Sequence, residues 1–184
     1  MYKILNLKIF VLIFLFVLSG CGKDPVRYVD NSINLVSNSS FEENGTGSLK
    51  YWTLSPLDAS NYSFVNDVPK NGGSYSLAIK ESWGIPNKVY TTVVLPTDKS
   101  QFRFSIWSKV ELKSCKIWIG IQKSDTLIQQ VQFIVNQTAW TNYISDFNYS
   151  PSAGDTLKVF LEGSSSSLQA SRSFFDLCKI EVIN

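Results

Sequence analysis

The sequence contains no histidine, and this absence excludes much of catalytic chemistry. Serine–histidine and cysteine–histidine nucleophile pairs, histidine metal sites and histidine proton shuttles all need an imidazole. Cysteine is scarce as well, with three residues in a chain of 184. A zinc site takes three or four ligands, mostly thiolates and imidazoles, which this chain supplies poorly. Nucleophilic hydrolysis and zinc chemistry are therefore not expected.

Paired carboxylates are also missing from the places where a sugar-cleaving enzyme needs them. Such enzymes set two carboxylates across a cleft or on one strand, and no Glu-x-Asp-x-x-Glu run occurs here. Glu42 and Glu43 are adjacent, so on a strand they point to opposite faces. The sequence thus indicates a protein that is not an enzyme.

The first 21 residues have the layout of a secretory signal. Two lysines precede an unbroken apolar run, Ile9–Leu18, which is too short to favour a membrane-spanning helix. The stretch "LSGC" that ends at Cys21 resembles a bacterial lipobox, which implies cleavage before Cys21 and lipid attachment to it. An ordinary signal peptide followed by a chance cysteine is the alternative. We expect a signal peptide over residues 1–20 and a lipidated tether over residues 21–33.

The residues after the predicted lipidation site bear on location. Gly22 and Lys23 follow Cys21, so the aspartate that resembles an inner-membrane retention signal is absent. Each buried CH₂ of an acyl chain contributes about 0.8 kcal/mol, so several chains anchor a protein firmly. We expect a bacterial cell-envelope protein held to a membrane by its lipid, with the outer membrane favoured where the cell has one.

The charge and length of the chain after residue 20 limit its partners and its domain count. Loss of residues 1–20 removes two of the 17 basic residues and none of the 15 acidic ones, so the mature chain is formally neutral. Without a basic stripe, nucleic acid is not an expected partner. The length suits one domain with a hydrophobic core, which we predict over residues 34–184.

No segment of the mature sequence shows a helical apolar period. Short runs of Val, Ile, Phe, Tyr, Trp and Thr alternate with clusters of Gly, Pro, Asn, Asp and Ser, which is typical of an all-β sandwich or barrel. The predicted strands are Asn34–Val36, Trp52–Leu54, Tyr62–Val65, Tyr75–Lys80, Lys88–Leu95, Gln101–Val110, Cys115–Gln122, Gln129–Val135, Thr141–Tyr149, Thr156–Glu162 and Ser173–Ile183.

Two of these strands alternate with particular clarity. In Gln101–Val110 and Cys115–Gln122, the aliphatic and phenylalanine side chains share one phase, which we expect to face the core. The other phase is polar except for one tryptophan in each strand, Trp107 and Trp118. Both indoles are therefore predicted to point away from the core.

Five stretches follow one another from Asn34 onward: "NLVSNSSFEENGTGSLKYWTL", "GGSYSLAIK", "QFRFSIWSKV", "TAWTNYISDF" and "FFDLCKIEVI". In this order they resemble the motifs of family 4/9-type carbohydrate-binding modules. The resemblance implies a jelly-roll β-sandwich of two antiparallel sheets, of the galactose-binding-like type, and non-catalytic glycan binding. The family's last strand commonly has two adjacent acids, whereas Leu177 stands at the second position here, and "KVYTTVVL" lacks a glutamine often found there. The resemblance therefore supports a prediction of the fold more strongly than a prediction of the ligand.

Outward aromatic rings on a sheet suit sugar binding. The apolar face of a pyranose stacks on the ring, while nearby polar side chains bond its hydroxyls. The alternative is that these rings form a second minor core or contact a lid. Trp83, in the loop "KESWGIPNK", would line the end of a groove. The candidate ligand-binding residues are Trp118, Trp83, Trp107, Arg103 and Gln122.

Asp176 raises a separate question, because strict alternation puts it on the predicted core phase with Ile180. A buried charge is costly unless it is paired or binds a metal. In modules of the resembled family, the equivalent aspartate often helps to hold a structural calcium. The resemblance then implies Asp176, Glu42 and the backbone near Ser74 as its ligands. The alternative is an aspartate capped by backbone N–H groups or paired with Arg172.

Cys115 and Cys178 both fall on the inward phase. An exported protein permits a disulfide between them. We favour two buried free thiols that pack as small apolar groups, because both residues lie among β-branched core residues rather than in loops.

The sequence leaves two hypotheses for the function. The first is a lipid-anchored, non-catalytic lipoprotein that binds polysaccharide or oligosaccharide through aromatic residues on one sheet face. The second is a structural or protein-interaction lipoprotein of the cell envelope with the same fold and no sugar ligand. Exposure of Trp118 in a groove favours the first, and a flat polar face over covered tryptophans favours the second.

Overall fold

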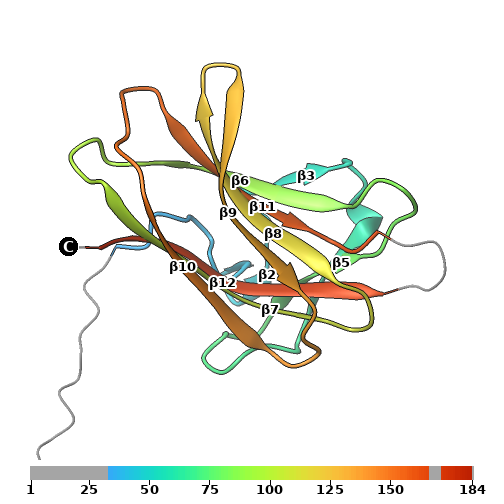
Figure 1. Ribbon diagram of the computed structural model, residues 1–184. Coiled ribbons are helices and arrows are strands. Elements are labelled where there is room, and N and C mark those ends of the chain that lie inside the picture. The colour runs from blue at the N-terminus through green and yellow to red at the C-terminus, as the bar shows by residue number, and fades with distance from the viewer. Residues whose placement is uncertain (1–32, 166–170, 184) are drawn as a thin grey trace, which may run out of the picture. The chain divides into compact units, whose positions relative to one another are not determined.

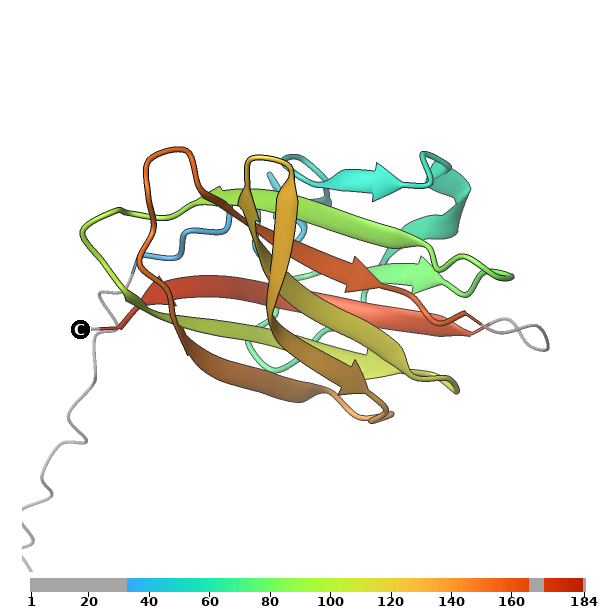
Figure 2. The ribbon, with the colours of Figure 1, turned by 45° about the horizontal axis from the view of Figure 1, so that its top comes forward.

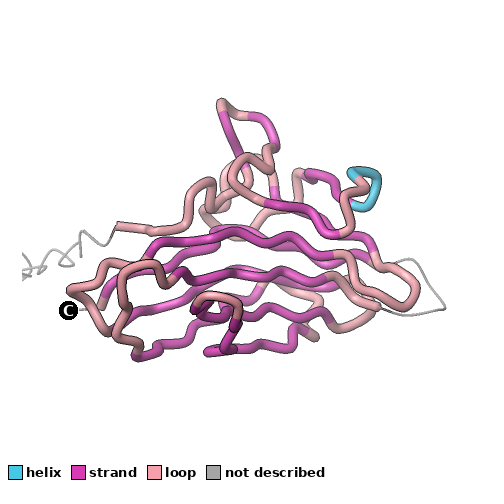
Figure 3. The backbone as a smooth tube through the Cα atoms, turned by 90° about the horizontal axis from the view of Figure 1, so that it is seen from above, coloured by secondary structure: helices cyan, strands magenta, loops and turns pink. Residues whose placement is uncertain are grey.

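The computed structural model describes residues 33–165 and 171–183 (Figure 1). They form two five-stranded antiparallel sheets that pack as the layers of a β-sandwich (Figures 2 and 3). The predicted all-β jelly-roll sandwich is confirmed. The predicted signal peptide and tether lie outside the described residues, apart from Ile33. In the described part of the chain, no helix is long and apolar enough to cross a membrane.

The two sheets divide the strands as follows. Sheet I has the order β3 (Thr53–Ser55), β6 (Lys88–Val94), β11 (Thr156–Glu162), β8 (Cys115–Lys123) and β9 (Thr126–Val135). Sheet II has the order β10 (Thr141–Asn148), β7 (Gln101–Val110), β12 (Arg172–Val182), β5 (Ser76–Lys80) and β4 (Tyr62–Val65). A small hairpin of β1 (Glu42–Glu43) and β2 (Thr46–Gly47) and a 3-10 turn (Ala59–Asn61) complete the described elements.

Most predicted strand bounds agree with the structure to within one residue, and larger differences occur in three places. Residues 34–36 lie beside β12 but form no regular strand. One backbone bond, from Leu35 N to Ile180 O, holds them, and the Asn34 side chain supplies others. The β1–β2 hairpin lies where no strand was predicted, and β9 starts three residues earlier than expected, at Thr126.

The core lies between the sheets and follows the predicted alternation in β7 and β8. Phe104 and Ile106 of β7 and Ile117 and Ile119 of β8 are fully buried. Complete burial of such a side chain contributes about 1.5–3 kcal/mol. All residues of this core belong to one compact unit, Ser32–Asn184, so a protein made of this unit includes the complete core.

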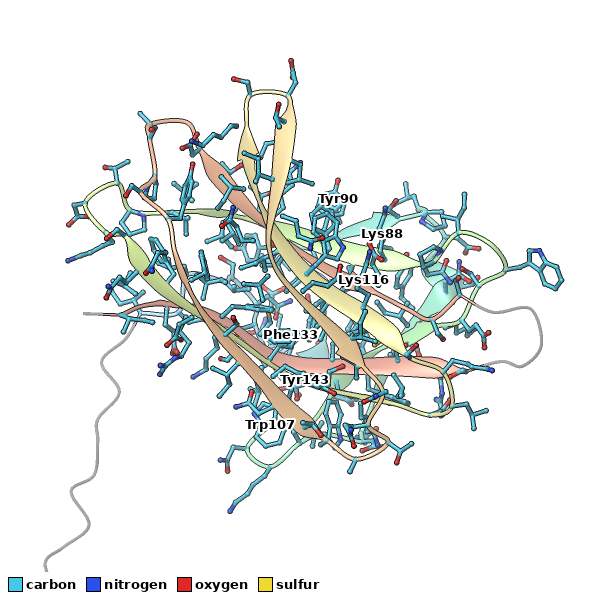
Figure 4. All side chains as sticks on the ribbon, viewed as in Figure 1. Lys88, Tyr90, Trp107, Lys116, Phe133 and Tyr143 are labelled. Atoms are coloured by element: carbon cyan, nitrogen blue, oxygen red, sulfur yellow. The ribbon has the colours of Figure 1, made fainter. Side chains whose placement is uncertain are left out.

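Aromatic rings close the sandwich where the edge strands β9 and β10 approach each other. The rings of Phe133 and Tyr143 have centroids 5.5 Å apart, and Phe133 also stacks on Phe104 at 6.0 Å. Figure 4 shows Phe133 and Tyr143 between Trp107 on one side and Tyr90 on the other. This closure separates the outer faces of sheets I and II.

A β-bulge in β12 changes the predicted phase of Asp176. The pairing with β7 shifts register between Asp176 and Lys179, and Leu177 has a positive φ of 50°. The extra residue lets Phe175 and Cys178 both face the core. Asp176 instead pairs with Trp107 on the outer phase of sheet II, so its predicted place on the core phase is wrong.

Candidate functional site

Three aromatic side chains cross the outer face of sheet I in one line, which we call the aromatic row. The strand register places Tyr90 of β6 opposite Phe160 of β11, and Phe160 opposite Trp118 of β8. The Trp118 and Phe160 rings are stacked, with centroids 3.9 Å apart and planes 8° apart. Tyr90 and Phe160 centroids are 5.5 Å apart. The central ring, Phe160, is 8% exposed, and the outer two are half-buried.

Strand alternation is the reason these rings point outward. Ile117 and Ile119, on either side of Trp118, are fully buried, so Trp118 must face the opposite way. Neighbouring strands lie about 4.8 Å apart, so the backbone of the row spans about 10 Å from β6 to β8. Thr53 continues the line at the β3 end and Gln132 at the β9 end, and both are exposed. The row is thus an apolar strip with a hydroxyl and an amide at its ends.

A nearly buried carboxylate orients Trp118. The indole Nε1 of Trp118 donates to Glu162 Oε1 at 2.8 Å, and Lys116 Nζ lies 3.1 Å from Glu162 Oε2. Lys116 Nζ also lies 5.6 Å from the Trp118 ring centroid, while Lys158 Nζ lies 5.9 Å from that of Tyr90. Cations and aromatic faces attract each other at such distances. The row is therefore flanked by polar groups that restrict its ring orientations.

The candidate ligand-binding residues do not share one surface. Trp118 and Gln122 lie on β8 and face outward from sheet I, and the Gln122 amide donates to the carbonyl of Ser124. Trp107 and Arg103 lie on β7 and face outward from sheet II, on the other side of the molecule. Figure 4 shows Trp107 separated from Lys88, Tyr90 and Lys116 by the body of the sandwich.

Trp83 lies in the connection that leads from β5 of sheet II to β6 of sheet I. Its side chain is 79% exposed, and Ile85 beside it is 76% exposed. Because β6 begins at Lys88, this loop adjoins the end of the face that carries the aromatic row. Trp83 thus stands apart from the three rings of the row.

The surroundings of Trp107 differ from those of Trp118. The half-buried indole lines a groove of about 440 Å³ together with Asn142, Ile144 and Lys179. Arg103 at the same groove forms a bidentate pair with Asp146, with distances of 2.7 and 2.9 Å. This pairing holds the pKa of Asp146 below its ordinary value. A single aromatic ring therefore sits here among groups that already bond one another.

The candidate metal residues do approach one another. Asp176 is completely buried, its Oδ1 accepts from Leu177 N at 2.8 Å, and its Oδ2 has no hydrogen-bond partner among the described residues. Glu42 Oε1 accepts from the backbone N–H groups of Ser74, at 2.5 Å, and Tyr75. The contact between Ser74 and Glu42 is thus a backbone hydrogen bond in which Ser74 is the donor.

Two glycines bring a backbone turn against these carboxylates. A Cβ atom on Gly72 would lie 2.4 Å from Asp176 Oδ2, and one on Gly73 would lie 2.7 Å from Glu42 Oε2. Burial raises the pKa of Asp176 to about 7, and the charge of Glu42 adds to the rise. Two carboxylates beside one turn, one with an unbonded oxygen, fit a hard cation such as Ca²⁺. Arg172 pairs with Glu111 at 2.6 Å, so it is not the partner of Asp176.

The described residues contain no group of three or more His, Cys, Asp or Glu side chains that could hold a metal ion. A cation at Asp176 and Glu42 would therefore take its further ligands from backbone carbonyls or water, as calcium commonly does. Cys115 and Cys178 are buried free thiols, in agreement with the favoured alternative. Burial raises the pKa of the Cys115 thiol to about 12 and also raises that of Cys178.

Sequence reasoning missed three members of the site: Tyr90, Phe160 and Glu162. The alternation of Lys88, Tyr90 and Thr92 against buried Val89 and Val93 contained the signal for Tyr90. Phe160 gave a weaker signal, because it stands in the continuous apolar run "VFL".

A β-sandwich with an aromatic strip across one sheet is the architecture of a carbohydrate-binding module. The profile of the carbohydrate-binding domain family CBM_4_9 matches residues 33–168. The chain belongs to this family, whose modules are non-catalytic, and the predicted family resemblance is confirmed. No curated protein sequence matches the chain.

Solved structures of carbohydrate-binding modules share the fold. The module TmCBM61, solved with β-1,4-galactotriose, is 19% identical, with a TM-score of 0.58 over 83% of this chain and 100% of its own. A family 16 module is 20% identical, with a TM-score of 0.58 over 80% of this chain and 99% of its own. The CBM22-1 xylan-binding domain of Paenibacillus barcinonensis Xyn10C is 15% identical, with a TM-score of 0.54 over 83% of this chain and 96% of its own.

Proposed function

We propose that this protein is a lipid-anchored glycan-binding lipoprotein that holds polysaccharide or oligosaccharide against the aromatic row of sheet I. The observation that carries the proposal is the row itself. Three rings are brought into line by strand register, and the outer two stay partly exposed. Sugar rings pack their C–H faces on such side chains, and neighbouring polar groups bond their hydroxyls.

The polar groups needed for hydroxyls surround the row. Thr53 and Gln132 lie at its two ends. Lys116 and Glu162 face the same way as the row and lie two residues along their strands from Trp118 and Phe160. The Trp118 indole is already oriented by Glu162, so less side-chain freedom is lost on binding. The galactotriose-bound and xylan-binding modules of the same fold make β-1,4-galactan and xylan reasonable first ligands to test.

Anchoring is proposed from the sequence alone. Cys21 would carry the lipid after cleavage of residues 1–20, and residues 21–33 would tether the domain to a membrane of the bacterial envelope, with the outer membrane favoured. Replacement of Cys21 by alanine in the full chain should move the protein from the membrane fraction to the soluble fraction. Retention of the C21A variant in the membrane would argue against the lipid anchor.

A structural calcium is proposed at Asp176 and Glu42, on the opposite side of the sandwich from the aromatic row. Asp176 and Glu42 would hold the ion with backbone oxygens near Gly73 and Ser74. The ion would neutralise two carboxylates that burial and mutual repulsion destabilise. Its role would be to stabilise the fold.

The test of sugar binding is a glycan array and an insoluble-polysaccharide pull-down with the unit Ser32–Asn184. Wild type, Trp118→Ala and Trp107→Ala are compared, because the two tryptophans lie on opposite faces. Binding that is lost in W118A and kept in W107A supports the proposal. The reverse pattern would move the site to sheet II. A folded protein that binds no glycan would support the structural or protein-interaction alternative.

A further inference from the structure

We propose that the outer face of sheet I is selective for anionic polysaccharide, whose uronate carboxylates or sulfate esters are met by three lysines around the aromatic row. This inference rests on the proposed function and names its ligand class. The outward positions of the five strands carry three lysines, Lys88, Lys116 and Lys158, and one acidic residue, Glu162.

The one carboxylate on this face, Glu162, already has hydrogen-bond and ion-pair partners within the protein. Glu162 is 8% exposed, accepts from the Trp118 indole and pairs with Lys116. Lys88 and Lys158 form no ion pair with any described residue. The face therefore presents a net positive charge on a mature chain that is formally neutral.

The lysines lie on both sides of the aromatic row. Lys88 and Lys116 face each other across Glu162, two residues along the strands from Tyr90 and Trp118. Lys158 lies two residues from Phe160 in the other direction along β11. Two residues of strand correspond to about 6.8 Å, which a lysine side chain can span. Figure 4 shows Lys88, Tyr90 and Lys116 close together on this side of the molecule.

This arrangement matches a sugar chain that lies along the row, across the strands. Each sugar ring would occupy about one strand spacing, about 4.8 Å. In a chain whose successive rings are turned by half a revolution, acidic substituents alternate between the two edges. Such a ligand would place anionic groups near Lys88 or Lys116 on one edge and near Lys158 on the other.

Desolvation separates an anionic ligand from a neutral one. A ligand that covers Lys88 and Lys158 removes water from two ammonium groups that form no ion pair with a described residue. A neutral sugar offers these ammonium groups only hydroxyl oxygens. A carboxylate or sulfate accepts charge-assisted hydrogen bonds from them, which are about twice as strong as neutral ones. Nucleic acid also carries anions and stacking bases, but the chain belongs to a carbohydrate-binding family, so glycan is the favoured ligand.

The experiment uses polymer pairs that differ only in charge. Titration calorimetry of Ser32–Asn184 compares polygalacturonate with its carboxyl-reduced form, and a sulfated galactan with its desulfated form. We expect about tenfold tighter binding to at least one charged polymer than to its neutral counterpart. The advantage should shrink as salt rises from about 0.05 M to about 0.5 M, because added ions screen exposed charges. The pair that shows the advantage identifies carboxylate or sulfate as the recognised group.

Matched variants assign the effect to the lysines. The double variant Lys88→Gln/Lys158→Gln should lose the preference for the charged polymer while its melting temperature stays close to that of wild type. Lys113→Gln, a control at an exposed lysine in the β7–β8 turn, should keep the preference. An unaltered preference in K88Q/K158Q would overturn the inference.

The remaining outcomes separate the inference from the proposed function. Equal affinity for both members of each pair, with binding still lost in Trp118→Ala, would overturn the inference and leave glycan binding at the row intact. Absence of binding to every polymer by folded protein would overturn the proposed function as well. Tighter, lysine-dependent binding of single-stranded oligonucleotide than of any glycan would replace the polysaccharide with nucleic acid.

Discussion

The indole Nε1 of Trp118 donates a hydrogen bond of 2.8 Å to Oε1 of Glu162, across the boundary between β8 and β11. A partly exposed aromatic ring is thus held by a nearly buried carboxylate. Aromatic side chains fixed before a ligand arrives lose less conformational entropy when it binds. The pair therefore links the packing of sheet I to its capacity to hold a ligand.

Trp118→Ala should lower glycan affinity about five- to thirtyfold, which corresponds to roughly 1–2 kcal/mol for a stacking ring. Because Trp118 also stacks on Phe160 and bonds Glu162, its removal should lower the melting temperature by a few degrees while the variant stays folded. Titration calorimetry and thermal unfolding measure the two effects. Trp107→Ala, on the opposite sheet, is the control, and equal loss of affinity in both variants would contradict a site confined to sheet I.

Glu162→Gln should strengthen binding to a charged polymer a few-fold. Glutamine keeps an oxygen that accepts from Trp118, while loss of the negative charge frees Lys116 from its ion pair. Glu162→Ala removes the acceptor as well, so it should weaken binding to neutral and charged polymers alike. Competition binding with both polymer types measures the difference. Weaker binding of the charged polymer by E162Q than by wild type would count against the role of charge.

Calcium should raise the melting temperature of the wild-type domain by several degrees, and a chelator should reverse the change. The ion would offset the cost of holding the unbonded Asp176 Oδ2 near Glu42 in a buried place. Asp176→Asn should unfold at the same temperature with and without calcium. Scanning calorimetry provides the measurement, and an unchanged wild-type transition in calcium and in chelator would exclude a stabilising calcium site.

The thiols of Cys115 and Cys178 should be inert in the folded protein. Both are buried, and burial raises their pKa values far above neutral pH, so almost no thiolate is available to react. A colorimetric thiol reagent should label neither cysteine of native Ser32–Asn184 and both after denaturation. Absence of two free thiols in the denatured, unreduced protein would reveal a disulfide.

Asp67 should contribute to a loss of stability in acid. Its carboxylate accepts from Lys109 and, at 2.9 Å, from the Trp140 indole, and the Lys109 bond is the main cause of its lowered pKa. A lowered folded pKa means that this stabilisation is present above the unfolded value of about 3.9 and is lost as the pH falls through the folded pKa.

The Asp67 side chain is half-exposed, so its effect should be below about 1 kcal/mol. Thermal unfolding of Asp67→Asn between about pH 5 and about pH 3 should therefore show a slightly smaller decrease than that of wild type. A steeper decrease in the variant would contradict this assignment.

Strand alternation predicted much of the fold, because the apolar phases of β7 and β8 are unambiguous. It showed that Trp107 and Trp118 both face away from the core. It did not show that β7 and β8 belong to different sheets, since alternation is the same whichever layer a strand joins. The predicted site therefore combined Trp107 and Trp118, which the structure places on the outer faces of different sheets.

The phase of Asp176 illustrates a second limit. Its burial was foreseen, but the bulge that moves it to the outer phase depends on a positive φ at Leu177. Leucine rarely adopts this conformation, so nothing in the local sequence signals the extra residue. The close approach of Gly72 to the same carboxylate comes from a segment a hundred residues away, which local patterns do not reach.

The two ends of the described chain both run beside sheet II. Leu35 bonds to Ile180 of β12, and Ile183 bonds to Gln101 of β7. Any polypeptide joined before Leu35 or after Ile183 therefore begins its path at the layer opposite Trp118. A fluorescent protein or an immobilisation tag fused at either terminus should leave the aromatic surface open, which makes the domain suitable for end-on display with its carbohydrate-facing side turned toward solution.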